Sequence, residues 1–148
     1  MGVLRLRGGG SVSIKLNFKG FDDYLEKLIK AEKNVDEVVE QCIQTSAGII
    51  QSEYVAAMSN AKVDSGLIGR MDPYTIEHNG NTFSAHIGYK KGPYNPKNPS
   101  DGYKAIFINY GTPRIHPRDF IKKMKKSSLP KVKKEEKKIL ENALGELK

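Results

Sequence analysis

The chain has no tryptophan, a single cysteine and, in 148 residues, no long apolar run. The one cysteine, Cys42, cannot form an internal disulfide and argues against a zinc site built from cysteines, which indicates a reducing intracellular compartment. No apolar stretch reaches the ~18 residues needed to span a membrane, so we expect no membrane contact. Hydrophobic residues make up 38% of the chain, enough for one modest core.

Residue patterns for catalysis or metal binding are also missing. His78, His86 and His116 form no His-x-x-x-His pair, and the first two are predicted on opposite faces of a hairpin. Ser65 does not sit in a Gly-x-Ser-x-Gly elbow, because Val63 occupies the place of the first glycine. Asp64 and Ser65 instead indicate a cap for a short helical turn over 67–71. We therefore expect no enzyme, no cofactor and no metal site.

Positive charge is concentrated in one part of the chain. The net charge is +8, and between Arg114 and Lys138 there are eleven Lys or Arg residues against three acids. A basic segment on an otherwise balanced chain indicates contact with a polyanion or an acidic partner. The candidate polyanion contacts are Lys122, Lys123, Lys125, Lys126, Lys131, Lys133 and Lys134. The alternative is that these lysines form an ordinary solvated helix face.

The first half of the chain shows the period of a strand and then that of helices. Apolar residues alternate from Val12 to Phe18, which predicts a short strand. Spacings of i, i+3 and i+4 predict an amphipathic helix over 21–29 and a longer one to about Ser59, with Asn34 as its N-cap. Cys42 lies on the apolar stripe of the longer helix and is interpreted as a packing residue.

A hairpin is predicted next. Tyr74, Ile76 and His78 alternate with polar residues, and so do the apolar residues from Phe83 to Tyr89. Asn79-Gly80 is a typical two-residue hairpin turn. With that turn, residues 78, 76 and 74 pair with 81, 83 and 85, which places the apolar members on one face.

The remaining segments are less regular. Residues 90–102 are rich in proline and predict a long mobile loop. After Pro117 a short amphipathic turn is expected, then an interruption at 127–130, then a last helix with Pro130 in its first turn. Residues 1–10 differ from the rest, and Val3–Gly9 resembles the carboxy-terminal tail of ubiquitin. We interpret 1–10 as a tag or flexible arm and 11–148 as a single domain.

The segment 103–120 organises the rest of the chain. An apolar and aromatic run, expected to be buried, ends at Gly111-Thr112-Pro113. Gly111 provides the positive φ that a turn requires, and prolines 113 and 117 favour an extended strap over 112–116. Phe120 then begins a basic helix.

This segment resembles the tail-completion or head-tail joining (neck) proteins of long-tailed phages and prophages. The resemblance rests on Tyr-x-Ala-x-Phe-x-x-x-Gly-Thr from Tyr103 to Thr112, followed by a proline and by Phe120 at a helix start. Val63–Leu67 looks like the family's Asp-Thr/Ser-Gly-x-Leu segment, and the likeness covers roughly residues 18–145. Asn109 replaces a usually acidic residue, and Arg118-Asp119-Phe120 replaces a more apolar step.

The resemblance implies a structural virion protein that completes the tail and joins it to the head connector. It would act at the head-tail junction, after assembly in the bacterial cytoplasm, with other neck and tail proteins as partners and as a homo-oligomeric ring. We expect an α+β fold with two N-terminal helices packed on a small, mainly antiparallel sheet and closed by C-terminal helices.

The candidate subunit or partner interface consists of Tyr103, Phe107, Tyr110, Gly111 and Thr112. Dense aromatic residues beside a loop are features that interfaces favour. The alternative is that Phe107 and its neighbours fill the core. A second function remains open, a small basic nucleic-acid-binding protein that uses the 114–138 surface. The two functions overlap, because a neck ring surrounds DNA in transit.

Overall fold

The computed structural model describes residues 2–7, 13–18, 26–27, 29–30, 34–79, 82–90 and 94–145. The elements follow in the order β1 (Gly2–Arg7), β2 (Ser13–Phe18), α2 (Val35–Asn60), α3 (Ser65–Gly69), β3 (Asp72–Asn79), β4 (Thr82–Gly88), α4 (Asp101–Tyr110) and α5 (Phe120–Gly145). The fold is α+β, as predicted. The helix expected over 21–29 lies mostly outside the described residues.

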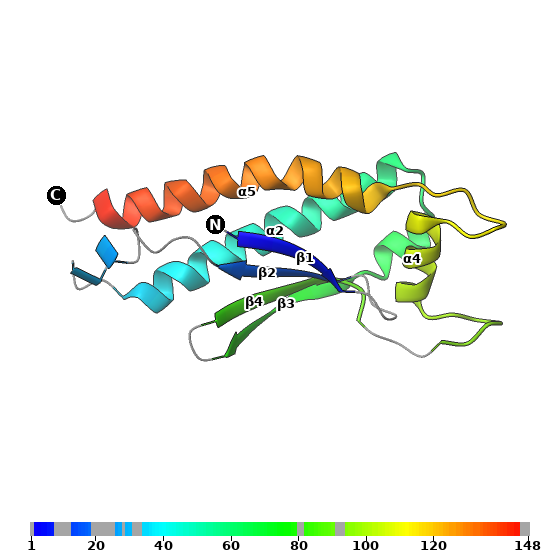
Figure 1. Cartoon of the computed structure of the whole chain (residues 1–148), viewed down its shortest axis with the longest axis horizontal. Helices are drawn as coiled ribbons and strands as arrows, with labels where there is room; N and C mark the ends of the chain where they lie inside the picture. Colours follow the sequence, from blue (N-terminus) through cyan, green and yellow to red (C-terminus); the bar gives the residue numbers. More distant parts are fainter. Residues whose placement is uncertain are drawn as a thin grey trace.

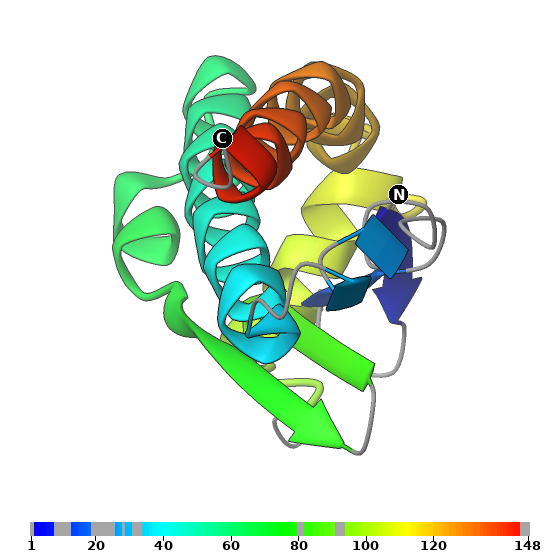
Figure 2. The same ribbon diagram turned by 90° about the vertical axis from the view of Figure 1, so that its left-hand side faces the viewer.

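Two long antiparallel helices and one sheet form the body of the molecule. α2 runs beside α5 along the long axis of the molecule (Figure 1). The sheet packs against α2, and α4 lies across one end of the molecule (Figure 1). Viewed end-on, α2 and α5 form one layer and the strands another (Figure 2). The strand order is β1-β2-β4-β3, and all neighbours are antiparallel. Within the described residues, no helix is long and apolar enough to cross a membrane.

The amino-terminal edge of the sheet includes a segment that the sequence analysis set apart. Gly2–Arg7 forms β1, which pairs with β2 so that Gly2 lies opposite Phe18 and Arg7 lies opposite Ser13. β2 itself follows the predicted alternation. The segment interpreted as a tag or flexible arm therefore occupies a place in the sheet, at its edge.

The hairpin of β3 and β4 forms, but in a different register. Asn79 pairs with Thr82 and Ile76 with Ala85, so the predicted pairing of 76 with 83 is wrong by two residues. A shift of two keeps every side chain on its predicted face, because strand faces alternate with a period of two. The observed register places His78 opposite Phe83, where the rings stack with centroids 3.9 Å apart.

α2 confirms the predicted helix and its start. The backbone N–H of Glu37 donates to Asn34 Oδ1 at 3.3 Å, so Asn34 is the N-cap. Its apolar stripe packs on β4 and α5 and includes the fully buried Ile43, Ile50 and Tyr54. This stripe forms most of the core.

α5 has no interruption at 127–130, so this prediction was wrong. It is one continuous helix with Pro130 inside it. Proline removes one helical hydrogen bond, a defect tolerated here on the solvent side, since Pro130 is exposed. The buried residues Met124, Ser128 and Val132 continue the packed stripe past the proline at four-residue spacing. Packing on α2 therefore holds together a helix that the local sequence divides.

Candidate interaction site

α4 has a buried face and an aromatic face. Gly102, Ala105 and Asn109 are buried against the body of the molecule. Tyr103 and Phe107 are half-buried and Tyr110 is 56% exposed. The expectation of a buried aromatic segment is therefore wrong for these three side chains, whose spacing of i, i+4 and i+7 places them on one helix face.

The aromatic face is enlarged by Tyr94, which the sequence analysis did not single out. The Tyr94 ring lies 5.0 Å from Tyr103 and 6.5 Å from Phe107, and Tyr94 is 56% exposed. We call Tyr94, Tyr103, Phe107 and Tyr110 the aromatic face. An aromatic residue between two prolines, Pro93 and Pro96, was the available signal for Tyr94, because such a loop residue cannot be assigned to a core stripe.

The loop before α4 is shorter than predicted. Asp101 and Gly102, expected in the 90–102 loop, already belong to the helix, with Ser100 at the N-cap position. The acidic Asp101 in the first turn suits the positive end of the helix dipole.

α4 ends at Gly111, where the apolar run was predicted to stop. Gly111 has a positive φ of 80°, and its N–H donates to the Phe107 carbonyl at 2.8 Å. A Cβ at this position would lie 2.9 Å from Ile115 O and from two atoms of Pro117. Only glycine fits this close approach.

A tight turn follows, where an extended strap over 112–116 was expected. Thr112 N donates to Ile115 O at 2.9 Å, and Ile115 N donates back to Thr112 O at 3.1 Å. Thr112 Oγ1 also accepts from the backbone N–H of Arg114 at 3.2 Å and of Ile115 at 3.0 Å. The threonine hydroxyl, together with Pro113 at the second turn position, favours this turn over the strap.

Asn109 connects α4 to α5. Its side chain is 2% exposed, and Oδ1 accepts from the backbone N–H of Ile121 at 3.0 Å. The first N–H groups of a helix have no partner within the helix, so this contact satisfies one of them. The Asn109 side chain therefore provides an acceptor at the start of α5.

Arg118 ties the segment between the 112–115 turn and α5 to the end of α2. Its Nη1 donates to Lys62 O at 2.8 Å and to Ala61 O at 3.3 Å. A guanidinium at a helix C-terminus satisfies unpaired carbonyls and suits the negative end of the dipole. Contacts with the end of α2 and the start of α5 thus fix the path of the chain between α4 and α5.

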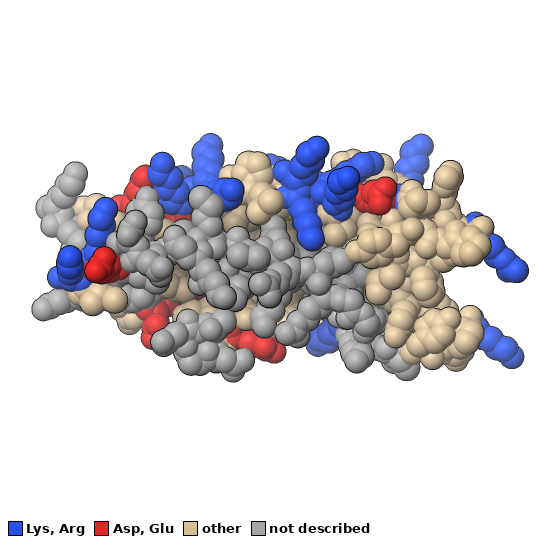
Figure 3. Space-filling view, in the orientation of Figure 1, with Lys and Arg blue, Asp and Glu red and all other residues tan. Residues whose placement is uncertain are grey.

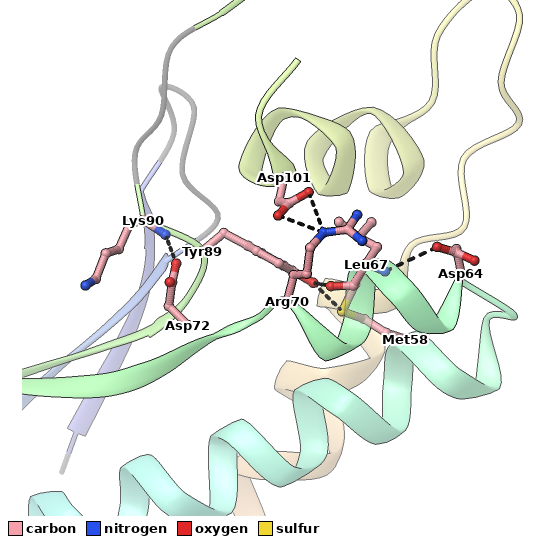
Figure 4. Close-up of polar contacts among 8 residues, drawn as sticks. All are labelled: Met58, Asp64, Leu67, Arg70, Asp72, Tyr89, Lys90 and Asp101. Carbon is pink, nitrogen blue, oxygen red and sulfur yellow. Dashed lines mark hydrogen bonds and ion pairs between the residues drawn. The ribbon is translucent and has the colours of Figure 1, made fainter. Parts of the chain in front are cut away.

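A buried tyrosine joins the end of β4 to α3, and an ion pair joins the start of α4 to the end of α3 (Figure 4). Tyr89 is 2% exposed, and its hydroxyl donates to Leu67 O at 2.7 Å. Arg70, just after α3, contacts both carboxylate oxygens of Asp101 at 3.2 and 3.1 Å. At the start of α3, Asp64 Oδ2 accepts from Leu67 N at 3.2 Å, which confirms the predicted cap.

The seven candidate polyanion contacts all lie on α5. Lys and Arg side chains gather along the edge of the molecule that α5 forms (Figure 3). Lys131 forms an ion pair with Glu53 of α2, and this pair lowers the pKa of Glu53. Among the residues that the structure describes, the other six candidates have no ion pair. Lys125 is half-buried and the other five are exposed.

A buried carboxyl group lies between α2 and α5. Glu136 is 1% exposed, and Ser46 Oγ donates to its Oε1 at 2.8 Å. Burial raises the pKa of Glu136, against the lowering effect of the Ser46 hydrogen bond. Burial and the nearby Glu136 raise the pKa of Cys42 to about 12, so the thiol stays protonated. Cys42 packs with Leu140, as a packing residue should.

The histidines are spread over separate places. His78 stacks on Phe83, whereas His86 Nε2 lies 3.4 Å from Glu77 Oε2 on the other face of the hairpin, as predicted. His116 is exposed after the turn. The part of the chain that the structure describes contains no group of three or more potential metal-ligating side chains.

Comparisons with models of protein families, with curated proteins and with solved structures found no match.

Proposed function

We propose that the chain is a structural virion protein of a tailed phage or prophage, located at the neck or tail end. It would complete the tail and join it to the head connector, as part of a homo-oligomeric ring. The finer fold expected from the resemblance, with two N-terminal helices on the sheet, belongs to this proposal.

The observation that carries the proposal is an ion pair between two residues that flank the segments behind the resemblance. Val63–Leu67 and Tyr103–Thr112 are far apart in the sequence, yet α3 and α4 are joined at one end of the molecule by the Arg70–Asp101 ion pair (Figure 4). Gly111 and Asn109, both in the second segment, fix the path from α4 to α5. The shared residues thus support one local structure with the aromatic face on its outside.

Particle completion tests this function. In the phage or prophage that encodes the chain, we expect deletion of the gene to leave heads and tails that accumulate unjoined in electron micrographs. Expression of the parent chain should restore joined particles. A Tyr110→Ala chain that unfolds like the parent but restores few particles would support a role of the aromatic face. Normal particles from the deletion would contradict the proposal.

Duplex DNA binding is a second candidate function, favoured by the six candidate lysines of α5 that have no ion pair with any residue in the described ranges. Lysines that neutralise phosphates release counterions, so binding should weaken steeply with salt. A matched pair of variants isolates the effect, because Lys133 has no ion pair among the described residues whereas Lys131 is held by Glu53. Lys133→Gln should lower the slope of log affinity against log salt by about 0.9, and Lys131→Gln by less. Binding insensitive to salt would contradict this function.

A further inference from the structure

Exposed apolar side chains gather at the end of the molecule that carries the aromatic face. Two segments, 94–100 and 111–119, project beyond α4 at this end (Figure 1). Among the residues that the structure describes, five large hydrophobic side chains are exposed. Three of them, Tyr94, Tyr110 and Ile115, belong to α4 or to the two projecting segments. Exposed apolar side chains that cluster in this way indicate a binding surface, because scattered ones need no explanation.

The rings of the aromatic face support one another and still leave ring surface open to solvent. Tyr94 lies against Tyr103 and Phe107, whose own ring centroids are 6.3 Å apart. Tyr94 and Tyr110 nevertheless remain exposed. A ring that its neighbours already hold in place loses little side-chain freedom when a ligand stacks on it. The aromatic face is therefore prepared to receive a flat ligand.

Positive charge flanks these rings. Residues 94–119 carry four Lys or Arg against two acids, and one of the acids, Asp101, is paired with Arg70. Lys97 and Arg114 are exposed and form no ion pair within the described part of the chain. Lys and Arg side chains stand at the outer ends of both projections, with uncharged surface between them (Figure 3). An extended anion that crosses this end would meet a cation on either side of the rings.

Exposed rings between cations match the chemistry of single-stranded nucleic acid. Such strands present unpaired bases, which stack on aromatic side chains, and phosphates, which pair with Lys and Arg. A duplex keeps its bases inside the stack, so exposed rings find no base faces to contact there. The only aromatic residue of α5, Phe120, is buried, so that helix offers lysines without exposed rings. The flanking cations also favour a polyanion over an uncharged protein surface.

We propose that the aromatic face binds single-stranded nucleic acid, with bases stacked on Tyr94 and Tyr110 and phosphates beside Lys97 and Arg114. The site uses other residues than the α5 lysines that are the candidate duplex contacts, and it goes beyond the neck function. Because every base has a face that can stack on a ring, the site binds without sequence preference.

Fluorescence anisotropy with a labelled oligothymidylate of about 12 nucleotides tests the site, a length within the range of known single-strand sites. Oligothymidylate does not pair with itself. Oligouridylate of the same length is the RNA probe, and the tighter of the two identifies the sugar that the site prefers.

Substitution of the two exposed rings should weaken strand binding. We expect Tyr94→Leu with Tyr110→Leu to bind at least about 10-fold more weakly than the parent, because stacking on both rings is lost. Tyr94→Phe with Tyr110→Phe keeps both rings and should bind like the parent. Tyr74→Leu is the matched control, since Tyr74 is an exposed tyrosine of β3, outside the site. Thermal unfolding by circular dichroism checks that each variant folds.

Two further measurements separate stacking from charge. Arg114→Gln should lower the slope of log affinity against log salt by about 0.7, the value for one phosphate contact on a single strand. The chain has no tryptophan, so its tyrosine emission can be followed directly, and stacked bases should quench it. The double leucine variant should leave duplex binding unchanged, because the α5 lysines are intact.

Three results would overturn the proposal. They are a parent that binds neither strand at low salt, a double leucine variant that binds the strand like the parent, and an equal loss of strand and duplex binding in that variant. A double leucine variant that keeps strand binding but fails to restore joined particles would assign the aromatic face to a protein partner instead. Strand binding does not decide the neck function, which particle completion tests separately.

Discussion

Replacement of Gly111 by alanine should destabilise the chain strongly, because this position combines a positive φ with close contacts around the added methyl group. Gly111 has φ 80° and ψ 169°, a region essentially limited to glycine, where another residue costs about 1–3 kcal/mol. The added Cβ would also lie 2.9 Å from Ile115 O and from Pro117 N. Crowding of this kind costs about 1–3 kcal/mol. Together the two effects predict a loss of about 2–6 kcal/mol.

Urea unfolding followed by circular dichroism measures this loss. Gly48→Ala is the control, because its Cβ meets nothing and alanine favours a helix interior by about 0.5–1 kcal/mol. The unfolding midpoint should fall for Gly111→Ala and rise slightly for Gly48→Ala, at similar slopes. A Gly111→Ala stability within about 0.5 kcal/mol of the parent, the range of a neutral surface change, would refute the strain argument.

Three further changes test the contacts around α4 and α5. Tyr89→Phe should lower the free energy of unfolding by about 1–3 kcal/mol, because the buried carbonyl of Leu67 loses its hydroxyl donor; an unchanged urea midpoint would show that the bond contributes nothing. Asn109→Ala should cost about 1–2 kcal/mol through the lost acceptor for Ile121 N, and hydrogen exchange should quicken first at the start of α5 rather than uniformly. Glu136→Gln should stabilise the chain near neutral pH, because the raised pKa of Glu136 means that the ionised form costs stability as pH rises. That gain should shrink as the pH falls towards 4.5, the ordinary pKa of a glutamate side chain. A gain that does not depend on pH would contradict a raised pKa for Glu136.

Some features of this protein follow from its sequence alone. The N-cap at Asn34, the cap at Asp64 and the positive φ of Gly111 were predictable because each depends on residues within a few positions. Strand faces were also predictable, since alternation with a period of two survives even the two-residue error in the hairpin register. The α+β class follows from these local signals.

Only the tertiary structure decided the rest. Pro130 and its neighbours end a helix by local rules, yet packing on α2 carries α5 through them. A glutamate on the apolar stripe of α5 is buried because Ser46 lies opposite it on another helix. Tyr94 joins the aromatic face through the path of a loop. Contacts between residues far apart in the chain have no local signal, because their free energy arises only once the elements pack together.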